Sequence, residues 1–354
     1  MTDGGGETNE GGVACLPVAG EENPYQLLMM RGLREGLGAN VYHGADGKVL
    51  PFTRTVLRSR PALIHVDWAH QYLYRRRRAL TMIQQALFVL DVALATLLGV
   101  RFAWTIHNVI PHGRDRVGRL RQWFAARCRL LRVFDAESGD TVVRTFGVTE
   151  SKVAVVPEGS YVDYYPEALP ALPSPRKVLL NVGNIRPYKN TSGLIEAFKR
   201  VSPGNWTLLI RGRAFDPAYA ARCKEAAAGR PDIIIDDAFV EERDLPRMFQ
   251  RATLVCLPFD QISNSGSVIM AMGYAKAVVA PASGAVAQRL SRQPELLFGA
   301  ERPLENALSY ALQLDADALA VIGERNRAAL QQHSWTDFAD VLADAAELNV
   351  DSRS

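Results

Sequence analysis

The second half of the chain alternates short apolar stretches with helix-like ones, and this alternation constrains the fold more than any other feature. The stretches "RKVLLNVG" (176–183), "NWTLLIRG" (205–212) and "TLVCLP" (253–258) are rich in β-branched and other apolar residues. Strands that alternate with helices form βαβ crossovers, which build parallel sheets. The first half, starting at "GVACLPV" (12–18), repeats the pattern less regularly. We predict an α/β protein whose ligands bind at the carboxyl ends of its strands.

The length of the chain and one proline-rich segment predict two domains that face each other across a cleft. At 354 residues the chain is longer than a single ordinary core requires. The segment "YYPEALPALPSPRK" (164–177) has four prolines and little periodicity, which is typical of a linker. The predicted parts are a disordered tail at 1–12, an N-terminal domain at 13–165, a linker at 166–176, a C-terminal domain at 177–332, and a final helix and tail at 333–354.

Charge and cysteine usage narrow the class of protein. The formal net charge is +3 and aromatic residues do not alternate with the arginines, so we expect no nucleic-acid partner. The four cysteines are scattered without a CxxC pair, which indicates a reduced compartment and no zinc site. The start "MTDGGGETNEGG" lacks the basic and apolar regions of a signal peptide. We predict a cytoplasmic protein.

An apolar stretch at 79–100 is long enough to span a bilayer. However, Gln84, Gln85 and Asp91 interrupt it, and a charged residue near the centre of a span costs about 3 kcal/mol. We therefore predict a buried or surface-lying helix here and not a membrane span.

Arginine is concentrated in the first half of the chain. Four arginines occupy 75–78, beside the apolar stretch, and seven more lie from Arg114 to Arg132. Basic side chains near an anionic leaflet contribute about 1 kcal/mol each to membrane binding. One interpretation is peripheral attachment to the inner face of a membrane, and the other is a solvated, salt-bridged helix surface.

Two segments of the second half combine features of an anion site. In "VGNIRPYKN" (182–190), Arg186 and Lys189 precede a helix, and a helix N-terminus attracts negative charge. In "ISNSGSVIMAMG" (262–273), a helix starts with small and polar residues, of which glycine permits close backbone approach and serine adds hydroxyl donors. We interpret the second segment as a diphosphate cradle. The alternatives are a solvated loop for the first segment and simple N-capping for the second.

The first half places polar residues directly after predicted strands. His107 and Asn108 follow one strand, and Asp67 and Trp68 follow another. Asp67 is a candidate base for an acceptor hydroxyl, although it could equally cap the next helix, and His107 could be structural. Near the linker, "VVPEGSYVDYYP" (155–166) adds aromatic and acidic residues suited to sugar hydroxyls. A second histidine, His112, could suggest a metal site, but together with Asp67 and His65 it makes a poor ligand set, so we expect no metal site.

Taken together, these stretches resemble glycosyltransferases of the GT-B fold, in particular the GT4-like group of bacterial nucleotide-sugar enzymes. The resemblance covers nearly the whole chain past the N-terminal tail. It is carried by "NPYQLLMMRGL", "WTIHNVIPHG", "NVGNIRPYKNTSGLIEAF" and "LPF" with "SNSGSVIMAMGYAKAVVAP". It implies two Rossmann-like domains, an N-terminal one for the acceptor and a C-terminal one for the sugar nucleotide, and a C-terminal helix that crosses back to the N-terminal domain.

The resemblance also implies roles for individual residues. Arg186 and Lys189 match the basic pair on the donor diphosphate, His107 matches a histidine that lines the donor-sugar pocket, and the loop from Phe239 to Leu245 matches the cover of the base. The expected donor-binding residues are Gly183, Asn184, Arg186, Lys189, Phe239, Asn264, Ser265, Gly266 and Ser267. The catalytic candidates are His107, Asp67 and Glu158, and the acceptor-binding candidates are Trp68, Asn108 and Tyr161.

The implied activity is transfer of a hexose of the mannose or glucose type from a nucleoside diphosphate sugar to a glycan or lipid-linked hydroxyl, without a metal or other cofactor. One departure matters: the two glutamates of the common GT4 pattern are replaced by Ile262 and Met270. Retention of anomeric configuration is therefore not supported, and an inverting enzyme needs a base near the acceptor. The alternatives are a sugar-nucleotide epimerase or hydrolase, and a non-catalytic sugar-nucleotide sensor.

Overall fold

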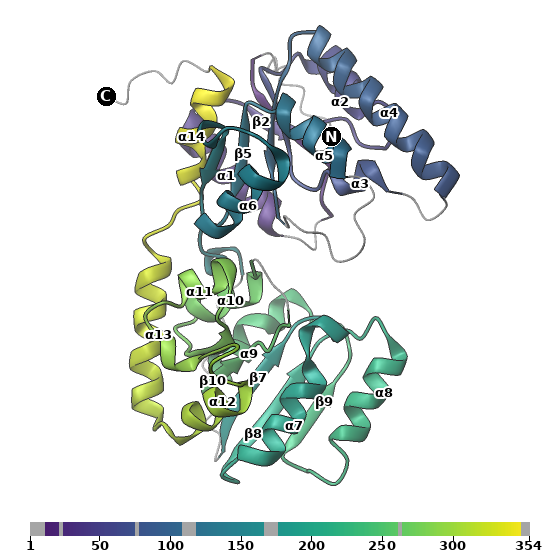
Figure 1. The fold of residues 1–354 in the computed structure, drawn as a ribbon. Coiled ribbons are helices and arrows are strands. Elements are labelled where there is room, and N and C mark those ends of the chain that lie inside the picture. Colours follow the sequence, from purple (N-terminus) through teal and green to yellow (C-terminus); the bar gives the residue numbers. More distant parts are fainter. Residues whose placement is uncertain are drawn as a thin grey trace, which may run out of the picture. The chain divides into compact units, whose positions relative to one another are not determined.

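The computed structural model describes residues 11–20, 24–74, 78–107, 118–165, 176–260 and 264–347. It divides into two compact units, which are coloured along the chain in Figure 1. Unit 1 consists of Met1–Glu158 and Ser334–Ser354, and unit 2 consists of Gly159–His333. The division falls seven residues before the predicted end of the first domain at 165. The predicted linker lies outside the described residues, apart from Arg176.

Unit 1 contains a six-stranded parallel sheet in the order β2-β1-β3-β4-β5-β6. The strands are β1 (Val13–Leu16), β2 (Val41–His43), β3 (Leu63–Val66), β4 (Arg101–Thr105), β5 (Leu130–Val133) and β6 (Val153–Val155). The helices are α1 (Pro24–Leu37), α2 (Pro51–Ser59), α3 (His70–Leu73), α4 (Arg78–Leu97), α5 (Gly118–Arg127), α6 (Ala136–Phe146) and α14 (Asp337–Ala346). Every residue of β1, β3 and β5 is buried, which explains why these strands are apolar apart from His65 on β3 and Arg132 on β5.

The last helix packs in unit 1, as the resemblance predicted. The turn before α14 and α14 itself lie against α1, and α1 carries glycines where they touch. A Cβ atom at Gly32 would lie 2.4 Å from the Trp335 carbonyl oxygen, and one at Gly36 would lie 2.3 Å from the Ala339 Cβ. Side chains at these two positions would therefore push the C-terminal segment away. Trp335 precedes the helix, which begins at Asp337.

Unit 2 contains a second six-stranded parallel sheet, in the order β12-β11-β10-β7-β8-β9. The strands are β7 (Lys177–Val182), β8 (Trp206–Arg211), β9 (Ile233–Asp236), β10 (Leu254–Cys256), β11 (Val278–Pro281) and β12 (Leu297–Phe298). The helices are α7 (Thr191–Val201), α8 (Pro217–Ala226), α9 (Leu245–Arg251), α10 (Gly266–Gly273), α11 (Gly284–Arg289), α12 (Leu304–Gln313) and α13 (Ala316–Leu330). The predicted α/β class with two parallel sheets is confirmed.

Helix α4 is the apolar stretch that resembled a membrane span, and its polar residues Gln84 and Asp91 are buried. The buried Asp91 carboxylate accepts hydrogen bonds from the backbone N–H groups of Phe52 (2.9 Å) and Thr53 (2.7 Å). Asp91 thereby caps the N-terminus of α2, whose own N-cap residue Leu50 offers no side-chain acceptor. The buried Gln84 donates to the Lys48 carbonyl at 3.0 Å. These interruptions of the apolar sequence are therefore structural contacts of α4.

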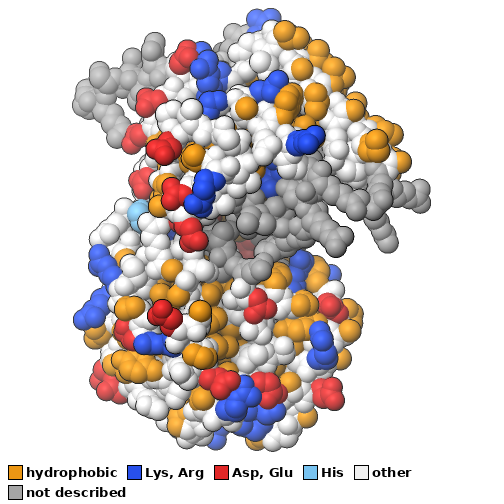
Figure 2. Space-filling model, viewed as in Figure 1, with side chains coloured by type: hydrophobic (Ala, Val, Ile, Leu, Met, Phe, Trp, Pro, Cys, Tyr) orange, Lys and Arg blue, Asp and Glu red, His pale blue; other side chains and the backbone are white. Residues whose placement is uncertain are grey.

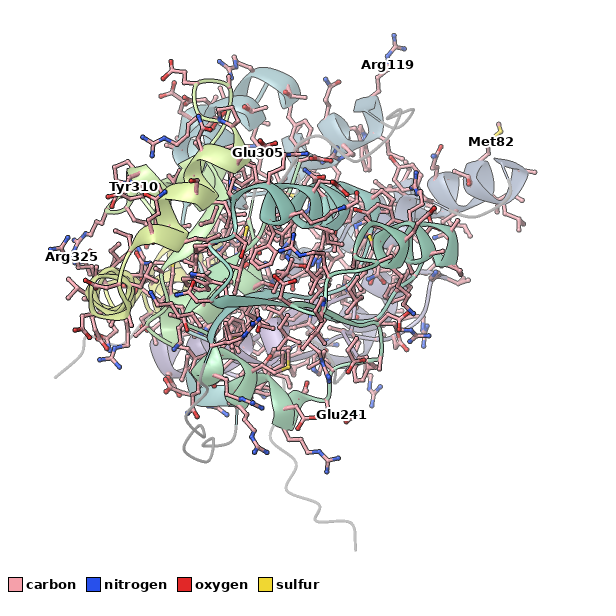
Figure 3. All side chains as sticks on the ribbon, turned by 90° about the horizontal axis from the view of Figure 1, so that it is seen from below. Met82, Arg119, Glu241, Glu305, Tyr310 and Arg325 are labelled. Carbon is pink, nitrogen blue, oxygen red and sulfur yellow. The ribbon has the colours of Figure 1, made fainter. Side chains whose placement is uncertain are left out.

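The outward face of α4 is apolar. Its exposed side chains include Leu97 (83% exposed), Met82 (71%) and Ile83 (58%). Figure 2 shows orange side chains along the part of unit 1 where Figure 1 draws α4, and Met82 points away from the protein in Figure 3. By length and composition, Ala79–Leu97 is the one helix in the described parts of the chain that could cross a membrane, and 28% of it is buried.

Asp91→Ala should destabilise unit 1 by about 1–2 kcal/mol, because two N–H groups at the start of α2 lose their acceptor. Urea unfolding followed by tryptophan fluorescence measures this, since four of the five tryptophans belong to unit 1. The control is Thr96→Ala, which removes an exposed hydroxyl bonded within α4 and should change stability by less than about 0.5 kcal/mol. Equal midpoints for the two variants would contradict the capping role.

Candidate functional site

Asp67 is the centre of a polar cluster at the carboxyl end of the sheet in unit 1. It is the first residue after β3 and is 1% exposed. Its Oδ1 accepts a hydrogen bond from the Tyr25 hydroxyl at 3.1 Å, and its Oδ2 accepts one from the Gln26 amide at 3.2 Å. Both partners lie in the first turn of α1, after β1. Parallel strands bring these residues to one edge of the sheet although they are distant in sequence.

His107 is the more exposed member of this cluster. It follows β4, and its Nε2 lies 3.5 Å from Oδ1 of Asp67, with 19% of its side chain exposed. Its ring stacks on Trp68 at a centroid distance of 5.1 Å and contacts Tyr25 edge-on at 4.9 Å. Three predicted site residues are therefore in contact: Asp67 and Trp68, which follow β3, and His107, which follows β4.

The surroundings of Asp67 favour its ionised form. Burial raises the pKa of its carboxyl, but His65, His107 and the hydrogen bonds from His107 and Gln26 outweigh burial, so the pKa lies below its usual value. Burial lowers the pKa of His65 to about 4, so His65 is neutral at pH 7. The His65 Nε2 pairs with the Thr105 hydroxyl at 2.8 Å. Asp67 is thus a carboxylate at neutral pH and His65 is a structural neighbour.

The other unit 1 candidates have different positions. Glu158 is 3% exposed, and its charge raises the pKa of the Tyr25 hydroxyl, after the larger effects of burial and Asp67. It therefore lies beside the same cluster. Asn108 and His112 lie outside the described residues. Tyr161 belongs to unit 2, where it is 6% exposed.

Tyr25 and Gln26 are site residues that the sequence did not single out. They occur inside "NPYQLLMMRGL", which was used only as a marker of the resemblance. A usable signal was present: both residues are polar and open a helix that follows a buried strand, the position where α/β ligand sites form. Their contacts to Asp67, some forty residues later, cannot be read from local pattern.

The second cluster lies at the carboxyl end of β7 in unit 2. Gly183 has a φ of +117°, a left-handed conformation that favours glycine. A Cβ atom there would lie 2.7 Å from the Lys189 ammonium nitrogen and 3.6 Å from the Ser267 hydroxyl oxygen. The glycine thus leaves room for a cation and a hydroxyl that approach it from different segments. The predicted donor-binding residues Gly183, Lys189 and Ser267 are therefore neighbours.

The Lys189 ammonium is a cation without a counter-charge. It lies 5.3 Å from the ring centroid of Phe259, and within the described residues it makes no hydrogen bond or ion pair. Burial and the neighbouring Arg186 lower its pKa to about 8. A half-buried cation with no ion pair or hydrogen bond in the described structure is costly for the folded state, and an anion bound beside it would remove that cost.

The start of α10 is capped by one of its polar residues, and the two residues after the cap are not used for capping. Ser265 is the N-cap: it is 8% exposed, and its hydroxyl accepts a hydrogen bond from the Val268 N–H at 3.4 Å. Gly266 is exposed and open space surrounds its Cα, while Ser267 faces Gly183. Capping therefore accounts for Ser265 and leaves the next two residues available to an anion. Asn264 is half-buried beside the cap.

The remaining donor candidates, Asn184, Arg186 and Phe239, lie in the loops after β7 and β9. The Arg186 guanidinium lies over the Phe215 ring at 4.4 Å, and Arg213 approaches the same ring at 5.1 Å. The sequence did not single out Phe215, which is 50% exposed. Phe239 is 49% exposed, as a residue that stacks on a base must be before the base binds. Asn184 is exposed.

Two further predictions concern the positions of the two GT4 glutamates and the metal site. Met270 is buried at 6% exposure within α10, whereas Ile262 lies outside the described residues. Over the described parts of the chain, no group of three or more His, Cys, Asp or Glu side chains is arranged to hold a metal ion.

Comparison with known proteins identifies a glycosyltransferase segment. The family model "Glycosyl transferases group 1" matches residues 176–314. The GDP-mannose:glycolipid 4-beta-D-mannosyltransferase of Xanthomonas campestris pv. campestris is 30% identical over 228 residues, which are 64% of this chain and 63% of the relative. The chain thus matches somewhat less than two thirds of that relative's length.

Solved structures confirm the fold. HepE of Anabaena, in complex with UDP and glucose, aligns with a TM-score of 0.70 at 15% identity and covers 96% of this chain and 100% of its own. Sucrose-phosphate synthase of Thermosynechococcus elongatus aligns with a TM-score of 0.71 at 16% identity, covering 96% of this chain and 98% of its own. The predicted GT-B fold is confirmed, and the family match over residues 176–314 agrees with the resemblance to glycosyltransferases.

The affinity of the unit 2 site for a diphosphate should decrease as the pH rises above about 8, because Lys189 then loses its charge. The decrease approaches at most about tenfold per pH unit, as for one proton linked to binding. Lys189→Met should bind the diphosphate about ten- to a hundredfold more weakly at pH 7, and its affinity should vary little between pH 7.5 and 9.5. Isothermal titration calorimetry measures both effects.

The control is Lys199→Met, which removes a partly exposed ammonium on α7 that is already paired with Glu196. This variant should keep the pH dependence of the wild type. A pH dependence that survives in Lys189→Met would assign the titrating group to another residue.

Proposed function

We propose that this protein transfers a mannosyl group from GDP-mannose to a hydroxyl of a glycolipid acceptor. The observation that carries the proposal is the unpaired Lys189 ammonium beside Gly183 and Ser267, because this arrangement suits a diphosphate. The choice of GDP-mannose rests on the relative at 30% identity, whose name specifies that donor and a glycolipid acceptor. UDP-glucose, the ligand of a neighbour at 14% identity, is the second donor to test.

The proposed reaction is a single displacement at the anomeric carbon. The acceptor oxygen forms a bond to that carbon, the bond to the β-phosphate oxygen breaks, and its electron pair leaves with GDP. Lys189, Arg186 and the N-terminus of α10 stabilise the negative charge that develops on the departing diphosphate. These groups supply the charge stabilisation that a divalent metal could otherwise provide, so we propose that transfer requires no metal.

We propose that the Asp67–His107 pair removes the acceptor proton. Asp67 is a buried carboxylate whose oxygens are occupied by Tyr25 and Gln26, whereas His107 reaches the surface. His107 therefore accepts the proton, and Asp67 orients and stabilises the resulting imidazolium. The separation of 3.5 Å suits a contact that tightens when substrates bind.

We further propose that the configuration at the anomeric carbon inverts. GDP-mannose carries an α-linked mannose, and the name of the mannosyltransferase relative specifies a β-linked product. One displacement with a base produces that change. The buried Met270, in place of a glutamate of the GT4 pattern, is consistent with this departure.

His107→Asn should lower kcat for mannosyl transfer by about a hundredfold or more, because general base catalysis contributes about 10² to 10⁴. Asp67→Asn should lower kcat by a similar factor while leaving the KM for GDP-mannose nearly unchanged. The assay uses GDP-[¹⁴C]mannose with a short-chain glycolipid acceptor, in buffer with EDTA. The control His43→Asn alters an exposed histidine at the end of β2 and should retain full activity.

Each result of this assay is informative. Release of free mannose without acceptor would favour the hydrolase alternative, and tight GDP-mannose binding without turnover would favour a sensor. Loss of transfer in EDTA that Mg²⁺ restores would contradict the metal-independent route.

We also propose that unit 1 binds an anionic membrane surface through the outward face of α4. From Gly47 to Arg114 the sequence contains ten basic residues and two acidic ones, Asp67 and Asp91. Both acids are 1% exposed, so the charged surface of this stretch is entirely basic. Arg54 and Arg58 are exposed on α2, which packs against α4. An apolar face bordered by cations is suited to lie in the interface of an anionic leaflet.

Two of the seven arginines from Arg114 to Arg132 do not contribute to such a surface. Arg121 is 6% exposed and lies over aromatic rings, and Arg132 is 1% exposed. Both interpretations of this segment, membrane attachment and a solvated, salt-bridged helix surface, place its arginines at the surface, and neither applies to these two residues. Arg119 does point outward (Figure 3).

The double variant Ile83→Glu/Leu90→Glu should abolish sedimentation of the protein with vesicles of phosphatidylglycerol and phosphatidylethanolamine. Two charges on the outward face of α4 must be desolvated or expelled from the interface. Val321→Glu is the control, because it places a charge on an exposed apolar position of unit 2. Retained sedimentation of the double variant, or no sedimentation of the wild type, would contradict the proposal.

A further inference from the structure

Arg132 is a buried cation on β5 that the proposed reaction does not use. It is 1% exposed, and no carboxylate among the described residues lies within ion-pairing distance of it. Its Nε donates to the Val156 carbonyl at 3.0 Å, and its Nη2 donates to the Pro157 carbonyl at 3.1 Å. These two carbonyls hold the strand end that leads to Glu158. The third direction of the guanidinium, through Nη1, points to Tyr25.

The Tyr25 hydroxyl connects Arg132 to the polar cluster around Asp67. Nη1 of Arg132 donates to the Tyr25 hydroxyl oxygen at 3.4 Å. That hydroxyl donates its own proton to Oδ1 of Asp67 at 3.1 Å, and the same Oδ1 faces Nε2 of His107 at 3.5 Å. Because the hydroxyl accepts from one side and donates to the other, its rotation is fixed.

Burial of the Arg132 guanidinium is unfavourable for the folded state unless a negative charge nearby stabilises it. Burying a guanidinium with only carbonyl and hydroxyl acceptors destabilises the folded state, and a buried apolar residue in its place would avoid that cost. The rings of Phe338 and Phe134, at 4.4 and 5.2 Å, recover a part of it. The nearest negative charge that the Tyr25 hydroxyl connects to Arg132 is the carboxylate of Asp67.

We propose that Arg132 is a positioning residue for the transfer reaction: its guanidinium holds the Tyr25 hydroxyl on Asp67 and thereby fixes the carboxylate that faces His107. This inference rests on the proposed function, since it assigns the base to the Asp67–His107 pair. Arg132 is not a catalytic residue, because it touches neither substrate. It acts through Tyr25.

The sign of the electrostatic effect follows from the groups around Asp67. The titratable groups that face it are Cys15 on β1, Tyr25 on α1, His65 on β3, His107 after β4 and Glu158 after β6, and Arg132 is the cation among them. From α14, the contact is made by Phe338, which does not titrate. A fixed positive charge favours the deprotonated form of a nearby acid or imidazolium. Removing it therefore raises the pKa of the base and moves the acidic limb of the pH–rate profile to higher pH.

The test compares Arg132→Met, Arg132→Lys and Tyr25→Phe in the mannosyl-transfer assay. Arg132→Met should shift the acidic limb of the kcat profile upward by about one pH unit and lower kcat at pH 7 about tenfold, with the KM for GDP-mannose unchanged. Arg132→Lys, which keeps the charge, should restore most of the wild-type profile. Tyr25→Phe should shift the limb in the same direction, and the double variant Arg132→Met/Tyr25→Phe should be no worse than the stronger single variant.

The control Arg121→Met removes a different buried guanidinium of unit 1 and should leave the acidic limb in place even if it lowers stability. If Arg132→Met does not fold, Tyr25→Phe and Arg132→Lys decide the question. An unshifted limb in Tyr25→Phe, additive effects in the double variant, or a limb in Arg132→Met that matches the wild type would overturn the inference. In that case Arg132 serves only to hold the end of β6.

A measurement without substrates separates this inference from the proposed function. In ¹³C-histidine-labelled protein, the His107 ring signal is assigned by its absence in His107→Asn, and its titration midpoint is followed by NMR. The midpoint should rise by about one pH unit in Arg132→Met and stay near the wild-type value in Arg132→Lys. A rise with no transfer activity in the wild type would leave the Arg132 contact established and the proposed reaction refuted. Transfer with an unmoved midpoint would refute the role of Arg132 alone.

Discussion

The uncompensated charge of Lys189 is the constraint on which the unit 2 site depends. Its ammonium is held beside Gly183 and Ser267 without a carboxylate partner in the described structure, and burial and Arg186 keep its pKa near 8. A protein tolerates such a group where a ligand supplies the missing charge. The left-handed backbone at Gly183 and the open start of α10 both leave space for such a ligand, since no side chain fills the region beside the Lys189 ammonium at Gly183 or at Gly266.

In unit 1, the buried charge has hydrogen-bond partners. The buried Asp67 carboxylate accepts hydrogen bonds from Tyr25 and Gln26 on α1 and faces His107 after β4, and its pKa is lowered in spite of burial. Among these partners, His107 is the one whose side chain is partly exposed. A site that combines an ionised, fully bonded carboxylate with a more exposed imidazole can orient and accept a proton, whereas a site with a free cation can stabilise a departing anion. Proton acceptance in unit 1 and stabilisation of an anion in unit 2 are the two chemical functions that the proposed transfer reaction requires.

Much of the fold could be predicted from sequence because burial on both faces makes parallel strands read as apolar runs. The three-residue strand β2 was too short for this signal. At the site, residues adjacent to strand ends were found, since the carboxyl edge of the sheet is a general location for ligands. Tyr25, Gln26 and Arg132 were missed because their roles depend on contacts between distant strands and helices. At the start of α10, pattern alone could not separate capping by Ser265 from the open approach at Gly266 and Ser267.

The stereochemistry of the product tests the central claim most directly, because it depends on the donor, the base and the single displacement together. The protein is incubated with GDP-[1-¹³C]mannose and a glycolipid acceptor, and the one-bond coupling between C1 and H1 of the transferred mannose is read by NMR. We predict a β-linked mannosyl glycolipid. An α-linked product, or labelled free mannose in place of a glycolipid, would contradict the account.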